Sequence, residues 1–233
     1  MKELSFGDEY WIPNEKNREA LFEALPLKLF KNIKQKKILE VGSGYGIYIY
    51  CLSKNNSMTG IEIDNKRVIE SRKILKKSKV KAKMLQGDAR NLPFKDKGFD
   101  AVFCHGVIEH FNESDIAIKE GYRVLKNNGI AMYSVPARFS FFVPFKLLQK
   151  LIDKVFKTNL WTCGFEKSFT PWKFKKLIRQ AGFKILHFEI SESVPGRRFP
   201  FIGKIMRLLD KPFWYLGIGG RFLYILCEKD TKE

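Results

Sequence analysis

Residues 38–46 read ILEVGSGYG, an apolar run with one acid that is followed by three glycines at every second position. The run predicts a short buried strand, and the glycines predict a turn whose backbone comes close to a ligand. The dinucleotide-binding turn G-x-G-x-x-G needs glycine at position 47, where this chain has isoleucine. Glu40 would also repel a pyrophosphate. The stretch therefore favours a cationic ligand that carries a ribose and an amino-acid tail.

Predicted strands and helices alternate along the rest of the chain. The predicted strands are 37–41, 58–63, 82–86, 99–104, 129–135, 183–188 and 221–228, and the predicted helices are 17–33, 46–54, 66–78, 114–125 and 172–180. Such alternation predicts a parallel sheet with helices on both of its faces.

Four further segments follow the glycine turn in order: TGIEID at 59–64, QGDARNLPF at 86–94, FDAVFCHGVIEH at 99–110 and RVLKNNGIAMY at 123–133. With the first stretch they resemble the class I S-adenosylmethionine-dependent methyltransferases of the small-molecule branch. The resemblance covers residues 36–135. It implies an α/β fold with a doubly wound, seven-stranded, mostly parallel sheet, in which the last strand runs antiparallel between the fifth and the sixth. It also implies S-adenosylmethionine as cofactor and S-adenosylhomocysteine as product.

The resemblance assigns roles to three carboxylates. Glu40 would bind the methionine ammonium, Glu62 the ribose hydroxyls and Asp88 the adenine amine. Asp64 comes two positions too late for the ribose and is predicted to cap a helix. The residues implied to bind the cofactor are Glu40, Gly42, Ser43, Gly44, Gly46, Glu62, Ile63, Asp88, Ala89, Cys104 and His105.

Two histidines are the catalytic candidates, His105 and His110. The usual pKa of histidine suits a general base, and His105 is expected nearer the sulfonium. His110 has a structural alternative, as a hydrogen-bonding group beneath the site. In the similar quinone-pathway O-methyltransferases, a glutamate three residues before the acid of the acid-histidine pair (here Glu109) helps bind a divalent metal. This chain has Gly106 at that position, so we predict no metal.

Charge is unevenly distributed over the 233 residues, whose net charge is +18. Residues 1–137 carry 24 basic and 17 acidic side chains, whereas residues 138–233 carry 19 and 8, together with 14 of the 21 phenylalanines. We predict a single domain, because the length suits one core. Its expected parts are an N-terminal helical cap (1–35), a cofactor-binding core (36–137) and two amphipathic lid or acceptor segments (138–170 and 195–220).

Residues 140–157 and 197–211 each place apolar side chains on one helical face and basic side chains on the other. The pattern is typical of a helix on an anionic membrane surface, and equally of a lid packed on the sheet. A basic surface also attracts nucleic acid, but no Asn-Pro-Pro-Tyr motif, the usual signal for methylation of bases, follows the fourth strand. No signal peptide or transmembrane segment is predicted, and the four cysteines lack metal spacing. We therefore expect a cytoplasmic protein, with a peripheral membrane location as the variant.

The expected function is transfer of a methyl group to an oxygen or carbon of a small acceptor of amphiphilic or lipid-like character. Two alternatives stay open: a methyltransferase that acts on RNA or protein, and a non-catalytic protein that binds through its basic surface. Aromatic residues that could wall the acceptor pocket are Tyr10, Trp11, Tyr133, Phe139 and Trp161. The sequence does not predict the oligomeric state.

Overall fold

A computed structural model describes residues 25–28, 30, 32–139, 155, 166–191, 208–209, 211–212, 216 and 222–230. Most of the two predicted amphipathic helices and most of the predicted helix 17–33 lie outside these residues, as do Tyr10, Trp11 and Trp161.

The described chain alternates between strands and helices, as predicted. The strands are β1 (Lys37–Val41), β2 (Ser57–Glu62), β3 (Ala82–Gln86), β4 (Phe99–His105), β5 (Leu125–Pro136), β6 (Phe183–Ile190) and β7 (Phe222–Lys229). The helices are α2 (Leu25–Lys28), α3 (Ile47–Leu52), α4 (Asn65–Lys77), η2 (Ile108–His110), α5 (Ser114–Val124) and α7 (Pro171–Gln180).

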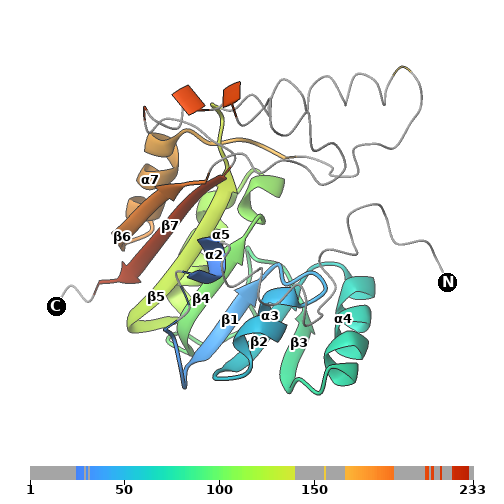
Figure 1. Cartoon of the computed structure of the whole chain (residues 1–233). Helices are drawn as coiled ribbons and strands as arrows, with labels where there is room; N and C mark the ends of the chain where they lie inside the picture. Colours follow the sequence, from blue (N-terminus) through green and yellow to red (C-terminus); the bar gives the residue numbers. More distant parts are fainter. Residues whose placement is uncertain are drawn as a thin grey trace.

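The seven strands form one sheet in the order β3-β2-β1-β4-β5-β7-β6 (Figure 1). Strands β1 to β5 pair in parallel, and β7 runs antiparallel to both β5 and β6. This arrangement confirms the predicted position of the last strand. The strand order reverses between β1 and β4, and in open α/β sheets the crevice at such a reversal, outside the carboxyl ends of the strands, is the usual place for a ligand.

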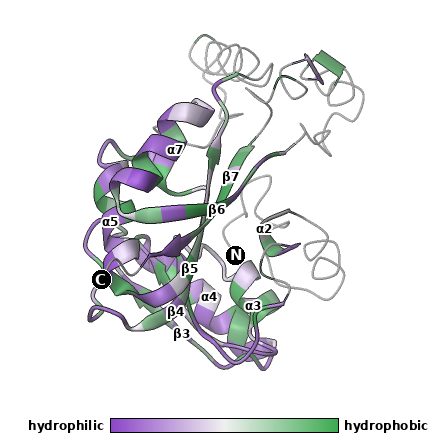
Figure 2. Cartoon of the chain, turned by 90° about the vertical axis from the view of Figure 1, so that its left-hand side faces the viewer, coloured by the Kyte–Doolittle hydropathy of each residue, from purple (hydrophilic) through white to green (hydrophobic). Residues whose placement is uncertain are grey.

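Each face of the sheet carries its own hydrophobic core. Helices α2, α3 and α4 pack on one face with Ile38, Met58 and Phe103, and helices α5 and α7 pack on the other with Leu39 and Val102. Figure 2 looks along the sheet and shows α5 and α7 on one side, with α2 and α3 on the other. Neighbouring strand residues alternate between the two cores because successive side chains in a strand point to opposite faces.

Strand β5 begins earlier than predicted. It starts at Leu125, whose partner is Phe99, and the next pair is Ala101 with Ile130, so the register shifts between them. The turn inside this bulge has a left-handed residue, Asn128, at φ 57°. The turn residues around Asn128, which the sequence analysis placed before the strand, therefore form a bulge inside it. Among the helices that the structure describes, none is long and apolar enough to cross a membrane.

Candidate active site

The turn after β1 requires its three glycines. Gly42, Gly44 and Gly46 have φ angles of 69°, 51° and 79°, the left-handed region that residues with a side chain rarely adopt. At Gly42 an added Cβ would also lie 2.3 Å from Val107 Cγ2, whereas at Gly44 it would meet nothing within 4 Å. Gly44 therefore faces open space, as a backbone that approaches a ligand must.

Strand β2 holds this turn in place. The backbone N–H groups of Gly42 and Ser43 both donate to the Ile61 carbonyl, at 2.8 and 3.0 Å. Ser43 is buried, and its hydroxyl donates to the same carbonyl at 3.4 Å. The glycine turn is thus fixed to the end of the neighbouring strand, so that the carboxylates of both strands have defined positions around it.

Glu62, at the end of β2, is bonded to the turn. Its Oε2 accepts from the Gly44 N–H at 2.9 Å, and its Oε1 accepts from the Asp64 N–H at 3.1 Å. Each carboxylate oxygen accepts more than one hydrogen bond, so Glu62 keeps capacity for hydroxyl donors. Asp64 caps α4, since its side chain accepts from the Lys66 N–H at 2.8 Å. This confirms the predicted cap.

Glu40 is buried beneath the turn, with only 2% of its surface exposed. Burial raises the pKa of its carboxyl well above the ordinary value; a hydrogen bond from the Ile49 backbone lowers it in part, and the charge of Glu62 raises it further. Within the described part of the chain, Glu40 Oε2 has no hydrogen-bond partner. A buried carboxylate oxygen without a partner is costly, and a cationic ligand would relieve that cost.

Further acidic groups surround the same strand ends. Glu109 follows β4 and is buried. The pKa of the Cys104 thiol is raised by burial and then by the charges of Glu109 and Glu40, which shows that both acids act on the end of β4. No three His, Cys, Asp or Glu side chains of the described ranges are placed to hold a metal ion. The absence of a metal stays a prediction.

Asp88 and Ala89 lie in the turn after β3. The Asp88 carboxylate accepts from the Arg90 guanidinium, at 2.7 Å for the shortest contact, and from the Arg90 N–H at 2.8 Å. The side-chain bond to Arg90 is the main cause that lowers the pKa of Asp88. Asp88 is therefore held as an anion beside the buried Ala89. The sequence did not reveal that Arg90 is its partner.

His105 ends β4 on the face covered by α3. Its Nδ1 shares a hydrogen bond with the hydroxyl of Ser134. Rings of Tyr48, Phe222 and Tyr224 lie around the imidazole, with centroids 5.5, 5.5 and 5.9 Å away. Sequence reasoning missed these four partners. The alternation along β5 and β7 could have suggested the face of Ser134 and Tyr224, but not their register against β4.

Comparison with known proteins identifies a domain within this chain. Residues 39–133 match the family model described as a methyltransferase domain, and this range runs from β1 through the glycine turn to β5. Residues 39–133 of this chain therefore form a methyltransferase domain. The resemblance inferred from five short segments is thereby confirmed, as is the predicted fold.

Two curated relatives match this chain over part of their own length. An uncharacterised protein of Methanocaldococcus jannaschii is 37% identical over 113 residues, which are 48% of this chain and 46% of that protein. A rice protein named 2-methyl-6-phytyl-1,4-hydroquinone methyltransferase 2, chloroplastic, is 27% identical to this chain. The match covers 84% of this chain and 47% of the rice protein. The match thus spans about half of each relative.

A solved structure shows the same fold as this chain. It is a crystal structure described as a putative methyltransferase of Bacillus halodurans, with a TM-score of 0.67 and 16% sequence identity, over 89% of this chain and 98% of that chain.

The remaining residues that the sequence predicted for the site lie at different depths below the surface. Ile63 follows Glu62 and is 63% exposed. His110 is exposed in η2, and its role stays a prediction. Tyr133 is a core residue of the α5 face, where its hydroxyl donates to the Ile118 carbonyl at 3.5 Å. It is not a wall of the acceptor pocket. Phe139 packs against Trp172 at 5.7 Å between ring centroids.

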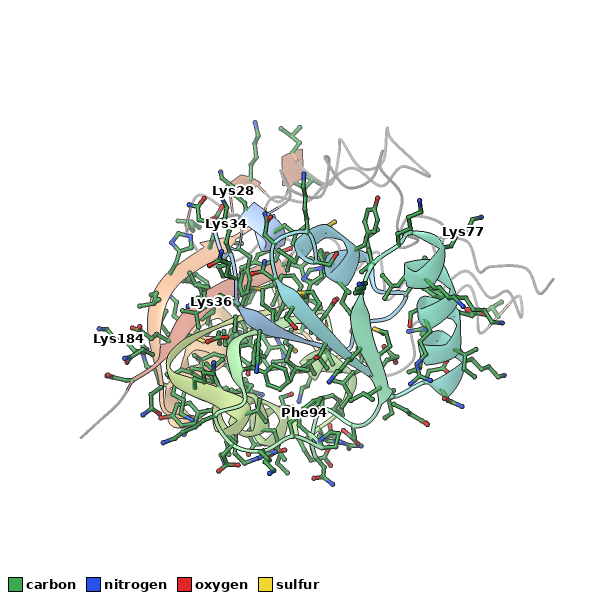
Figure 3. The ribbon with its side chains drawn as sticks, turned by 90° about the horizontal axis from the view of Figure 1, so that it is seen from below. Lys28, Lys34, Lys36, Lys77, Phe94 and Lys184 are labelled. Carbon is green, nitrogen blue, oxygen red and sulfur yellow. The ribbon has the colours of Figure 1, made fainter. Side chains whose placement is uncertain are left out.

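The acidic side chains beside the glycine turn suit a cation better than an anion. Glu40 and Glu62 present carboxylates, and Gly44 faces open space beside them. The outer surface has the opposite character, because exposed lysines such as Lys28 and Lys77 project from different sides of the protein (Figure 3). Carboxylates beside the glycine turn, in a chain of net charge +18, suit a ligand that carries cationic groups.

Proposed function

We propose that this chain binds S-adenosylmethionine at the glycine turn and transfers its methyl group to an oxygen or carbon of a small, amphiphilic acceptor. One observation carries the proposal: the buried Glu40 Oε2, without a partner in the described residues, lies beneath a turn whose glycine backbone faces open space. When bound, the cofactor supplies an activated methyl group on a positively charged sulfur.

The protein's own residues bind and orient the reactants in this proposal. Glu40 would accept the methionine ammonium, directly or through water, and Glu62 the ribose hydroxyls. Asp88, kept ionised by Arg90, would accept from the adenine amine, while the exposed Ile63 offers an apolar surface to the purine. Methyl transfer is an in-line displacement, and orientation of the two reactants alone can lower its barrier by several kcal/mol.

Two strand connections support the position of the acceptor. The segments before and after residues 140–165 meet at the carboxyl end of β5, where the Arg138 N–H donates to the Phe169 carbonyl at 2.8 Å. The residues on either side of the segment 192–221 are also in contact, because the Ser191 N–H donates to the Phe222 carbonyl at 2.9 Å. Phe222 contacts His105. Both predicted acceptor segments therefore leave and rejoin the sheet beside the proposed transfer site.

An amphiphilic acceptor agrees with the name of the rice relative, whose printed substrate is a phytyl hydroquinone. It also agrees with the phenylalanine-rich, basic composition of residues 138–233. Flotation with vesicles of anionic lipid tests the membrane variant of this proposal. A protein that stays with the soluble fraction at low salt would contradict it.

Calorimetry with S-adenosylhomocysteine tests the cofactor assignment. The wild-type chain is expected to bind, and Glu62→Ala to bind about 1–3 kcal/mol more weakly, because the ribose hydroxyls and the Gly44 N–H lose their acceptor. Asp64→Ala is the matched control, since its carboxylate lies two residues later and caps α4. A wild-type chain that binds no S-adenosylhomocysteine would overturn the proposal.

A further inference from the structure

One arginine side chain fixes the carboxylate in the turn after β3. Arg90 donates to both oxygens of Asp88: its Nε lies 3.0 Å from Oδ1 and 3.1 Å from Oδ2, and its Nη2 lies 2.7 Å from Oδ2. The Arg90 backbone N–H also donates to Oδ1, at 2.8 Å. Within the described part of the chain, every donor to this carboxylate thus belongs to Arg90.

These bonds leave the carboxylate little freedom to turn. A carboxylate has about four acceptor sites, and three N–H groups of Arg90 (Nε, Nη2 and the backbone) occupy most of them. A planar guanidinium that bonds both oxygens also fixes the plane of the carboxylate. The remaining acceptor capacity of Asp88 therefore lies on the side that Arg90 does not occupy.

The arginine is itself held by the segment between η2 and α5. Its Nη1 donates to Glu113 Oε2 at 3.1 Å, and its guanidinium carbon lies 5.2 Å from the centroid of the Phe111 ring. A single exposed ion pair contributes little, but two-pronged geometry and a network of several charges are the conditions under which such pairs matter. Both conditions are met here, although 37% of the Arg90 side chain is exposed. Arg90 can thus hold Asp88 in one orientation.

We propose that Arg90 is a positioning residue that makes the cofactor site selective for adenine over hypoxanthine, because it holds the open side of the Asp88 carboxylate toward the exocyclic amine. This inference rests on the proposed binding of S-adenosylmethionine. Hypoxanthine carries an exocyclic oxygen in place of the amine, and a hydrogen on the neighbouring ring nitrogen. A carboxylate that cannot turn meets this oxygen as a second acceptor and repels it.

Loss of the guanidinium is expected to admit both bases. Asp88 would keep only the backbone N–H of residue 90 as a donor, so that its carboxylate could turn and accept from the ring N–H of hypoxanthine. A site that hydrogen-bonds a ligand group rejects an analogue without that group far more strongly than shape alone can. Selectivity between two bases of nearly equal shape therefore reports the orientation of Asp88.

Calorimetry with S-adenosylhomocysteine and with S-inosylhomocysteine, its hypoxanthine analogue, measures this selectivity. The wild-type chain is expected to prefer the adenine compound about 100-fold, and Arg90→Met only about 10-fold, a loss equal to about one hydrogen bond to a charged group. An unchanged or larger ratio of affinities in Arg90→Met would overturn the inference.

Arg90→Lys separates geometry from charge. Lysine keeps the positive charge but cannot bond both carboxylate oxygens through a rigid fork. We therefore expect its ratio of affinities to fall as in Arg90→Met. A wild-type ratio in Arg90→Lys would show that charge alone suffices, and would contradict the positioning role.

Arg123 offers a matched control in the same connection. It donates to the carbonyls of Leu92 and Phe94, at 3.0 and 2.7 Å, and to the Glu120 carboxylate of α5 at 2.7 Å, without a bond to Asp88. Arg123→Met is expected to lower Tm at least as much as Arg90→Met and to keep the wild-type ratio of affinities. Equal losses of selectivity in both variants would indicate general loosening of this connection and would overturn the role of Arg90.

The wild-type titrations separate this inference from the proposed function. A chain that binds no S-adenosylhomocysteine loses the proposed cofactor. A chain that binds S-adenosylhomocysteine and S-inosylhomocysteine equally well keeps the proposed function and loses only the selectivity assigned to Arg90.

Discussion

Two of the buried charged side chains lie at opposite ends of the strands, Glu40 on β1 and Lys229 on β7. Lys229 has its donors occupied by the protein itself: its Nζ donates to the carbonyls of Tyr122 and Leu125, at 2.8 and 2.9 Å, and lies 4.5 Å from the centroid of the Tyr122 ring. Glu40 has the opposite arrangement, because its Oε2 meets no donor among the described residues.

The difference separates a structural charge from one that serves a ligand. A buried charge whose partners come from its own chain joins elements of the fold, and here Lys229 ties the end of β7 to the junction of α5 and β5. A buried charge with an open oxygen raises the free energy of the protein alone. A ligand of opposite charge recovers that free energy, so the location of the unpaired atom suggests a binding site.

The largest effect is expected for Glu40→Gln, which keeps the shape and removes the charge. S-adenosylhomocysteine affinity should fall about 100-fold, or about 3 kcal/mol, because truncating one partner of a buried charge pair costs about this much. Calorimetry measures it. Glu70→Gln, on the exposed face of α4, is the control and should bind like the wild type. An unchanged affinity of Glu40→Gln would break the comparison.

The same variant should change the pH dependence of stability without ligand. The pKa of Glu40 is raised in the folded protein, so the folded state holds this proton more tightly than the unfolded chain. Its stabilising contribution is complete below the ordinary value of 4.5 and is lost as the pH rises through the raised value. Wild-type Tm should therefore fall relative to that of Glu40→Gln over this window. A constant Tm difference from about pH 4 to 8 would contradict the burial of an ionising group.

Lys229→Met should give the reverse result, a loss of stability with binding intact. The carbonyls of Tyr122 and Leu125 would lose their donor, at a cost of about 2–3 kcal/mol in the free energy of unfolding. Urea denaturation measures this, with Lys77→Met on the exposed side of α4 as a control that should change stability by less than about 0.5 kcal/mol. Weakened S-adenosylhomocysteine binding in Lys229→Met would show that the two buried charges are not independent.

Gly44→Ala should lower both the stability of the protein and its affinity for S-adenosylhomocysteine. Its φ of 51° makes alanine strained by about 1–2 kcal/mol, although the new methyl group meets no protein atom within 4 Å. The methyl group would instead occupy the space that the proposed ligand approaches. Binding should therefore weaken by more than the stability loss explains. Calorimetry and urea denaturation on one sample decide this, and full affinity would place the ligand elsewhere.

Asp64→Ala should have the smallest effect. Removal of the cap of α4 costs about 1 kcal/mol of stability, and S-adenosylhomocysteine affinity should stay within about twofold of the wild type, a change of about 0.4 kcal/mol. A thermal unfolding curve and one titration suffice. A large loss of affinity would assign the ribose contact to Asp64 and would remove Glu62 from that role.

Most of the fold followed from local patterns. The period of apolar residues, the glycine turn and the Asp64 cap depend on neighbours in the chain, and each lies where the sequence predicted it. The start of β5 did not follow, because the bulge at Asn128 exists only through pairing with β4. Similarly, the sequence placed Tyr133 in a strand but could not say which core it enters.

The site divides in the same way. The sequence by itself determined that three glycines and the carboxylates of Glu40 and Glu62 lie together, because parallel strands end at the same edge and a left-handed turn requires glycine. Only the tertiary structure decided that Glu40 keeps an unpaired oxygen, that Arg90 holds Asp88, and that Ser134 and Tyr224 stand beside His105. These relations depend on strand register and side-chain packing between residues distant in the chain, which no local pattern encodes.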